Sequence, residues 1–325
     1  MNLDSIDWPS LERLRTAFLD GTAGVQDYWL GERDLASYDQ TFAQRIGWKW
    51  DYVLNELKRR GWSPPTGEVL DWGCGTGIAG RAFVEHFGAD TISTLCLWDR
   101  SSRAMEFAAR RVRERFPKLK VRTESPTGRT VGSILLSHVI TELSKSQIEE
   151  ILALTNEATC VLWVEPGTHV ASRRLIEVRE KLRERFRVVA PCTHQVACGM
   201  LAPENSRDWC HHFAPSPSQV FTDGNWARFA RIAGVNLRSL PLSFIVLDKR
   251  PQPPLPQGAT RVIGEPRVYK AHALILGCAE SGVHERRLMK RNDPVEFRRL
   301  KKGDMDPLQL WKCEGDEIME VRPLE

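Results

Sequence analysis

The feature that most constrains the fold is a short apolar segment that runs directly into three closely spaced glycines. Residues 68–72 follow the break Ser63-Pro-Pro-Thr-Gly67 and predict a short strand. The strand leads into the string Asp71-Trp-Gly-Cys-Gly-Thr-Gly77, and a helix is expected after it. Glycine allows the left-handed backbone of a tight turn, and bare backbone amides at a helix N-terminus favour an anionic group. The string therefore predicts the first strand, turn and helix of an α/β domain.

Strands and helices are expected to alternate along much of the remaining chain. The residue pattern predicts further strands at 94–98, 119–123, 133–137, 159–164, 187–190 and 243–248. Helices are expected between them at 103–116, 147–156 and 172–186. This alternation is typical of a parallel sheet covered by helices on both faces, so we expect an α/β, Rossmann-like fold.

The 325 residues are enough for one α/β domain with flanking elements. Apolar residues at helical spacing predict an N-terminal helical region over residues 1–62, followed by the Rossmann-like domain at 63–250. Residues 191–235 interrupt the rhythm with Pro, His, Cys and Trp, and we interpret them as a Cys-rich insertion. A stiff, proline-rich linker at 250–256 then leads into a C-terminal extension, 251–325, with a basic tail.

Composition and the first residues indicate where the protein works. Hydrophobic residues make up 42% and charged residues 27% of the chain, which is typical of a soluble globular protein. No run of about 18 or more apolar residues offers a membrane span. Residues 1–8 contain two acids and no apolar core of a secretory signal. We therefore expect a cytoplasmic protein without a membrane partner, and we expect a monomer.

The glycine string is compatible with two nucleoside cofactors. Gly75-Thr-Gly-Ile-Ala-Gly80 satisfies the dinucleotide pattern, which keeps an NAD-dependent oxidoreductase open. Asp71 favours S-adenosylmethionine instead, because its carboxylate can balance the methionine ammonium and would gain nothing from a pyrophosphate. Asp99 ends the next strand, where it suits the ribose of either cofactor. The candidate cofactor-binding residues are Asp71, Gly73, Cys74, Gly75, Gly77, Asp99 and Arg100.

The eight cysteines fall into two groups. Cys74, Cys96 and Cys160 lie in or beside predicted strands and are interpreted as small buried apolar residues, and Cys313 has no assignment. The remaining four lie in the irregular segments and are Cys192, Cys198, Cys210 and Cys278. In a cytoplasm such cysteines are metal ligands or free thiols more often than disulfides.

The spacing of these four cysteines lacks the close ligand pair that begins most zinc ribbons and fingers. Four thiolates from scattered loops favour an iron–sulfur cluster. A mixed zinc site remains an alternative, completed by His194, His211, His212 or His272, and unliganded thiols are a third interpretation.

Basic residues are concentrated near the C-terminus. Eight of them lie between residues 286 and 302, namely Arg286, Arg287, Lys290, Arg291, Arg298, Arg299, Lys301 and Lys302. This density suits contact with phosphates, although a solvated basic helix is the alternative.

Several motifs together are more specific than any one alone. They are the glycine string from Val69, Asp99-Arg-Ser101, Leu135–Leu143, Val164–Thr168, Ala190–His194, Asp208–Phe213, and Lys270-Ala-His272 followed by Cys278. In this combination the chain resembles the methyltransferase-like family of small-ribosomal-subunit assembly proteins, which includes a mitochondrial ribosome-associated factor and its bacterial relatives. Thr193 and Gly199 depart from the family by replacing two common prolines, which changes loop stiffness and leaves the thiols unchanged.

The resemblance implies a class I (Rossmann-like) methyltransferase fold that binds S-adenosylmethionine. It also implies a 4Fe-4S cluster held by the four cysteines at 192, 198, 210 and 278, and a partner in the RNA of the small ribosomal subunit. The expected function is methylation of that RNA during assembly of the subunit.

The chain shows no familiar catalytic motif for base methylation. An Asn or Asp followed by two prolines and an aromatic residue is missing after the fourth predicted strand, where Ser137-His-Val-Ile140 stands. His138, Glu142 and Glu165 lie near strand ends and are candidate catalytic residues, with a supporting or capping role as the alternative. A non-catalytic assembly factor that binds S-adenosylmethionine and RNA therefore remains a second hypothesis.

Overall fold

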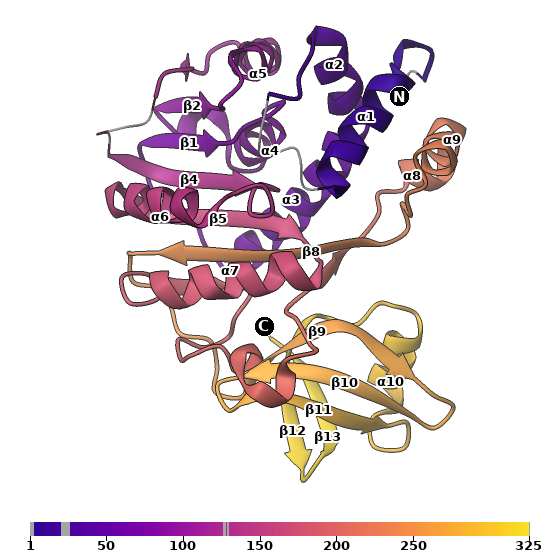
Figure 1. Cartoon of the computed structure of the whole chain (residues 1–325). Helices are drawn as coiled ribbons and strands as arrows, with labels where there is room; N and C mark the ends of the chain where they lie inside the picture. The colour runs from indigo at the N-terminus through magenta and orange to yellow at the C-terminus, as the bar shows by residue number, and fades with distance from the viewer. Residues whose placement is uncertain (1–2, 21–26, 126–127, 129, 325) are drawn as a thin grey trace. The chain divides into compact units, whose positions relative to one another are not determined.

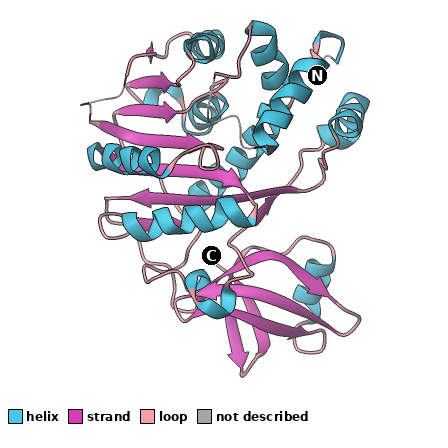
Figure 2. Cartoon of the chain, in the orientation of Figure 1, coloured by secondary structure: helices cyan, strands magenta, loops and turns pink. Residues whose placement is uncertain are grey.

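The computed structural model describes residues 3–20, 27–125, 128 and 130–324 (Figures 1 and 2). The chain forms two compact units, one from residues 1–166 and 214–242 and the other from 167–213 and 243–325. The division at residues 62 and 250 remains a prediction from the sequence. None of the described helices is long and apolar enough to cross a membrane.

The first unit contains a parallel sheet with the strand order β3-β2-β1-β4-β5. Its elements are β1 (Glu68–Trp72), α4 (Ile78–Phe87), β2 (Thr94–Trp98), α5 (Ser102–Arg115), β3 (Val121–Arg122), β4 (Val131–Ser137), α6 (Lys145–Leu154) and β5 (Ala158–Pro166). The strands β2 and β4 are buried along nearly their whole length, as expected where helices cover both faces. This order is part of the doubly wound nucleotide-binding arrangement, so the predicted α/β, Rossmann-like fold class is confirmed.

Helices precede this sheet, as the apolar spacing predicts. They are α1 (Trp8–Leu19), α2 (Glu32–Gln40) and α3 (Phe42–Arg59). The buried face of α3 includes Ile46, Trp50 and Val53, which recur at helical spacing. Two later helices, α8 (Gln219–Thr222) and α9 (Gly224–Ala233), belong to the same unit, and Trp226 of α9 meets Trp48 with ring centroids 4.9 Å apart.

The described residues also form short 3₁₀ helices. They are η1 (Leu3–Ser5), η2 (Ala89–Thr91), η3 (Thr155–Glu157), η4 (Gly199–Leu201) and η5 (Pro203–Asn205).

The second unit begins with α7 (His169–Leu182) and β6 (Arg187–Ala190). The strand β6 pairs with β8 (Leu240–Asp248), and β7 (His212–Ala214) also pairs with β8. The pairing of β6 with β8 is antiparallel. The expectation of a purely parallel arrangement is therefore wrong at this point, because the chain reverses direction between these two strands.

The C-terminal extension forms a closed barrel, which the sequence interpretation did not include. Its strands are β9 (Ala259–Val268), β10 (His272–Ala279), β11 (Gly282–Met289), β12 (Leu308–Glu314) and β13 (Glu317–Pro323), in the order β10-β11-β13-β12-β9. The helix α10 (Pro294–Lys301) follows β11. The barrel core contains Ala273, Ile275, Leu288 and Ile318, and Phe297 of α10 packs into it.

The predicted basic tail does not form one helix. Arg286 and Arg287 lie in β11, Lys290 and Arg291 lie in the following turn, and the other four cations lie in or just after α10. The solvated-helix interpretation is therefore wrong for the first half of this stretch, since these residues belong to a strand and a turn of the barrel.

Candidate functional site

The glycine turn after β1 has the backbone that the sequence predicts. Gly73, Gly75 and Gly77 have φ values of 68°, 50° and 78°. A Cβ at Gly73 would lie 2.8 Å from Val139 Cγ1, and one at Gly77 would lie 2.9 Å from Ala108 Cβ. A Cβ at Gly75 would meet nothing within 4 Å. Two of the glycines are thus required by packing as well as by conformation, whereas the middle one borders open space.

The amides of the turn are bound within the protein. Gly73 N and Cys74 N both donate to Trp98 O, at 2.8 and 3.0 Å, and Gly75 N donates to Asp99 Oδ2 at 2.9 Å. The expectation of bare amides is therefore wrong at these three positions. These bonds fix the turn against the end of β2.

Asp71 lies at the end of β1 and is fully buried. Its Oδ2 accepts a hydrogen bond of 2.8 Å from Gly80 N in the first part of α4. Its Oδ1 is buried and has no hydrogen-bond partner among the described residues. Burial raises the pKa of Asp71 to about 7. The carboxylate thus braces β1 against α4 and retains one unused acceptor, which is the kind of group that a buried ammonium would satisfy.

Asp99 follows β2 beside the glycine turn. Besides its bond to the turn, its Oδ1 accepts from Ser101 N at 2.9 Å. Burial raises the pKa of Asp99, and the two backbone hydrogen bonds oppose that shift. The neighbouring Arg100 places its guanidinium 5.2 Å from the ring centroid of Tyr28. A carboxylate has about four acceptor positions, so Asp99 can still accept bonds from further hydroxyl groups.

The loop after β4 is held by Glu165 of β5. Its Oε1 accepts from Val139 N and Ile140 N, both at 3.0 Å, and from Trp163 Nε1 at 2.6 Å. Glu165 is fully buried, and burial raises its pKa to about 7. These contacts identify Glu165 as a positioning residue for the loop, because its bound oxygen is saturated by three donors of the protein itself.

His138 opens this loop with a left-handed backbone, φ 57°, which is uncommon for a residue other than glycine. Its backbone N–H donates to Val164 O at 2.9 Å, and its side-chain Nε2 lies 3.5 Å from Lys49 Nζ. Burial lowers the pKa of His138, and Lys49 and Arg45 lower it further. Such strain persists only where the surrounding structure enforces it, and it is often found at functional sites.

Lys49 is a residue that the sequence interpretation missed. Its side chain is 6% exposed, on the buried face of α3. Burial and the nearby Arg45 lower the pKa of Lys49 to about 7. The available signal was the run Trp48-Lys-Trp50, which places a cation inside an apolar helix pattern, but its partner could not be read from the sequence.

Glu142, the third catalytic candidate, is half-buried near Asp99 and Arg100. Burial raises the pKa of Glu142 to about 7, Arg100 lowers it, and Asp99 raises it. The structure therefore brings the predicted groups after β2 and β4 within electrostatic range of each other. Ligands of open α/β sheets bind outside this carboxyl edge of the strands.

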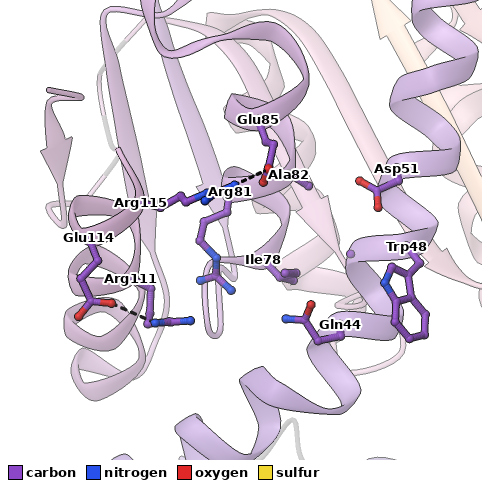
Figure 3. Close-up of a pocket in the computed structure, with 11 residues that line it drawn as sticks. Gln44, Trp48, Asp51, Ile78, Arg81, Ala82, Glu85, Arg111, Glu114 and Arg115 are labelled. Carbon is purple, nitrogen blue, oxygen red and sulfur yellow. Dashed lines mark hydrogen bonds and ion pairs between the residues drawn. The ribbon is translucent and has the colours of Figure 1, made fainter. Parts of the chain in front are cut away.

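A cavity of about 450 Å³ lies elsewhere in the same unit, between side chains of α3, α4 and α5 (Figure 3). Three arginines line it, and each is paired with a carboxylate. Arg111 bonds Glu114 at 3.0 Å, and Arg115 bonds Glu85 at 2.7 Å. Arg81 is likewise paired with a buried carboxylate of α2 at 2.5 Å. The charges are balanced within the protein, so this cavity is no candidate for an anionic ligand.

The four cysteines of the irregular segments lie together in the second unit. Cys192, Cys198 and Cys210 line one small cavity beside α7. Cys198 and Cys278 belong to one buried cluster, against which Cys210 packs. Burial raises the pKa of Cys198 to about 11. Within the described part of the chain, no group of three or more His, Cys, Asp or Glu residues is arranged to hold a single metal ion.

Two arginines that are each 1% exposed lie beside these thiols. Arg179 of α7 donates from Nη2 to Val196 O at 3.0 Å, and its charge interacts with Cys192 and Cys198. Arg261 of β9 lowers the pKa of Cys278, in opposition to burial. Two buried guanidinium groups next to four thiols favour a negatively charged state of the sulfurs.

Two of the four histidines considered as zinc ligands lie close to the cysteine sulfurs, and the other two stack on aromatic rings. His194 Nε2 lies 3.5 Å from Cys278 Sγ, and His212 Nε2 lies 3.6 Å from Cys210 Sγ. His211 stacks on Trp209, and His272 stacks on Tyr269. Of the remaining cysteines, Cys74, Cys96 and Cys160 are buried and Cys313 is exposed.

The parallel sheet, the glycine turn and the acidic residue after β2 define a domain with the class I methyltransferase fold. A family model described as mitochondrial small ribosomal subunit Rsm22 matches residues 50–306, and the chain belongs to this family. The resemblance seen in the sequence is thereby confirmed. The cytoplasmic location stays a prediction, since the family is described as mitochondrial.

Two solved methyltransferase structures have a fold similar to that of the chain. A plantazolicin methyltransferase with bound SAH is 15% identical, with a TM-score of 0.41, over 75% of this chain and 100% of the other. The magnesium protoporphyrin IX methyltransferase of Synechocystis with bound SAM is 12% identical, also with a TM-score of 0.41, over 74% and 97%. No curated protein sequence matches the chain.

Proposed function

We propose that this Rsm22-family protein is an S-adenosylmethionine-dependent methyltransferase that acts on the RNA of the small ribosomal subunit. The observation that carries the proposal is the meeting of Asp71, the glycine turn and Asp99 at the carboxyl edge of β1 and β2. The family description links the chain to the small ribosomal subunit.

The binding residues have separable roles in this proposal. Asp99 accepts hydrogen bonds from the ribose hydroxyls, and Gly75 lets the ligand approach the turn. The unused oxygen of Asp71 complements the methionine ammonium. Gly73, Cys74 and Gly77 form the same turn, and the charge of Arg100 interacts with Asp99 beside it. S-adenosylmethionine, when bound, supplies an electrophilic methyl group.

The pair formed by Lys49 and His138 is suited to take a proton from a nucleobase nitrogen. The pKa of each group is lowered, so His138 is neutral at pH 7 and Lys49 is neutral in a substantial fraction of molecules. A neutral nitrogen at the strand edge can act as a general base. Glu165 holds the loop that follows β4, which His138 begins, and Glu142 interacts electrostatically with Asp99 and Arg100.

Titration calorimetry with S-adenosylmethionine, its demethylated product and NAD tests the cofactor assignment. Asp99→Asn should weaken S-adenosylmethionine binding by roughly 10- to 150-fold, because hydrogen bonds to a charged acceptor are worth ~1.5–3 kcal/mol. Asp90→Asn, on the exposed segment η2, is the matched control and should bind as the wild type does. Tight NAD binding without any response to S-adenosylmethionine would replace the assignment by an oxidoreductase.

The cysteine site is proposed to hold a 4Fe-4S cluster through Cys192, Cys198, Cys210 and Cys278. Four cysteine thiolates are the usual ligands of such a cluster. The buried charges of Arg179 and Arg261 support an anionic group at this place. Zinc held by thiolates with His194 or His212 is the alternative. Metal content and the visible spectrum of anaerobically purified protein distinguish the two, since zinc is colourless.

A second candidate function is a non-catalytic assembly factor. It is favoured by the turn amides, which are already bound within the protein. Transfer of a labelled methyl group from S-adenosylmethionine to isolated small subunits separates the two functions. Incorporation that is lost in Lys49→Met supports the enzyme, whereas subunit binding without any incorporation supports the assembly factor.

A further inference from the structure

The connectivity of the C-terminal barrel is specific. The strands β9, β10 and β11 form an antiparallel meander, and β11 then pairs in parallel with β13. The strand β12 closes the barrel between β13 and β9, and α10 lies between β11 and β12 in the chain. This is the topology of the oligonucleotide- and oligosaccharide-binding fold, in which the second and third strands and the adjacent loops face the ligand.

The fold alone does not identify a ligand, so the class of ligand must be inferred from the side chains on the outer face of β10 and β11. Ala273 and Ile275 of β10 face the barrel core, so the alternating residues His272 and Leu274 face outward. Arg287 of β11 pairs with Leu274 in the register and is exposed. The corresponding face of this barrel therefore carries a cation beside a half-buried apolar side chain.

An aromatic pair continues this face at the β9–β10 loop. Tyr269 and His272 are stacked with centroids 4.7 Å apart and an interplanar angle of 18°. Tyr269 is 47% exposed, and its N–H donates to His272 O at 2.8 Å, which fixes the loop. Lys270 lies between them in the chain and is exposed.

Two further cations lie next to this loop. Lys290 N donates to Ala271 O at 2.9 Å, which joins the turn after β11 to the loop after β9. Lys290 and Arg291 are both exposed. Asp293, two residues beyond Arg291, uses its carboxylate to accept from Glu296 N and Val321 N. We define the aromatic–basic patch as Tyr269, Lys270, His272, Arg287, Lys290 and Arg291.

We propose that the aromatic–basic patch binds single-stranded RNA. A base stacks on the exposed ring of Tyr269, whose orientation His272 fixes, and the four cations contact phosphates on either side. Stacking needs an unpaired base, because paired bases in an RNA helix do not expose their faces. The inference deepens the proposed function, on which it rests, by assigning an RNA-binding surface outside the methyltransferase sheet.

The strand β10 also supplies an internal control. Cys278 lies six residues beyond His272 on the same strand, so about 20 Å separates the cysteine site from the patch. Substitutions in the patch should therefore leave the metal content and the absorbance of the protein unchanged. Retention of both shows that the second unit is still folded in each variant.

Fluorescence anisotropy of the full chain with a labelled oligouridine of about 12 nucleotides tests the proposal, since one such barrel covers ~4–16 nucleotides. We expect Tyr269→Ala to raise the Kd by roughly tenfold or more, and Tyr269→Phe to restore binding because it keeps the ring. Phe221→Ala removes an aromatic side chain that is 61% exposed on α8 and should have no effect. Lys290→Gln with Arg291→Gln should reduce the salt slope by about 0.7 for each lost contact.

The outcomes separate this inference from the proposed function. Oligouridine binding that Tyr269→Ala leaves unchanged, or tighter binding of an RNA duplex than of the single strand, overturns the patch assignment. In either case, S-adenosylmethionine titration and methyl transfer to small subunits still report on the proposed function. Failure of the wild type to bind either RNA overturns the patch, and methyl transfer then decides the proposed function separately.

Discussion

Replacement of Lys49 by methionine should stabilise the protein and, at the same time, abolish methyl transfer. Methionine keeps most of the length and apolar volume of the lysine stem but carries no charge. Lys49 is 6% exposed, and burial lowers its pKa from 10.5 to about 7. The folded protein therefore releases this proton more readily than the unfolded chain does.

The magnitude and sign follow from proton linkage. Between pH 7 and 10.5 the unfolded chain binds more protons at this residue, so the free energy of unfolding rises with pH across this window. At about 1.36 kcal/mol for each pH unit, the destabilisation at and below pH 7 amounts to about 5 kcal/mol as an upper bound. Loss of the contact with His138 costs about 1 kcal/mol in return, so Lys49→Met should gain several kcal/mol at pH 7.

Urea unfolding followed by tryptophan fluorescence at pH 6.5, 8 and 9.5 measures this effect. The gain from Lys49→Met should be largest at the lowest pH and should shrink towards zero near pH 10.5. Lys58→Met, at an exposed position of the same helix, is the matched control and should show no such pH dependence. A destabilisation by Lys49→Met that is equal at every pH would refute the reasoning.

The cysteine site and the glycine turn can each be tested with a matched pair of substitutions. Cys192→Ser should lower both the metal content and the thermal midpoint, because metal–ligand binding contributes to folding. Cys313→Ser, at an exposed position, should change neither. Equal effects of the two substitutions would contradict the assignment of Cys192 as a ligand. Gly73→Ala should cost more stability than Gly303→Ala in urea unfolding. Both glycines have φ near 70°, where alanine is strained by about 1–2 kcal/mol. Only a Cβ at Gly73 would meet a neighbour, at 2.8 Å. Equal losses of stability in the two variants would exclude this contact as the reason for the larger effect at Gly73.

The glycine turn and its flanking strands could be predicted because local signals specify them. The strands β1 and β2 begin and end at the predicted residues, since continuous apolar runs are bounded by turn residues. The role of the amides could not be predicted. Their acceptors, Trp98 O and Asp99, approach the turn only when β2 pairs with β1.

The barrel could not be recognised from the same kind of signal. In β11, Leu288 is the one fully buried side chain, while His, Glu and Arg occupy most other positions, so the apolar alternation is too weak. The barrel is packed by residues that lie far apart in the chain. For example, a Cβ at Gly277 would collide with the ring of Trp311. The same reason explains why Lys49 was missed, because its partner His138 is 89 residues away.

Arg179 offers a test of whether the buried charges around the cysteines serve an anionic cluster. Its guanidinium is 1% exposed, and it interacts with Cys192, Cys198 and Glu180. When the thiols are protonated, the ion pair with Glu180 balances the buried cation and the neutral sulfurs add little. When thiolates hold a cluster, the same cation lies beside a group with net negative charge and becomes favourable.

Arg179→Met should therefore destabilise the loaded protein by more than the metal-free protein. In metal-free protein prepared with a chelator, the variant should lose little stability, because Glu180 keeps its ion pair with Arg183 after Arg179 is removed. In anaerobically loaded protein it should be less stable and should lose iron at a higher pH during acidification. Arg183→Met is the control, because it removes a half-exposed cation that also pairs with Glu180. It should change the stability of the loaded and the metal-free protein by less than about 1 kcal/mol each. A change of the same sign and size in loaded and metal-free protein would mean that Arg179 only braces the loop through Val196 O, and the electrostatic argument for an anionic cluster would then fail.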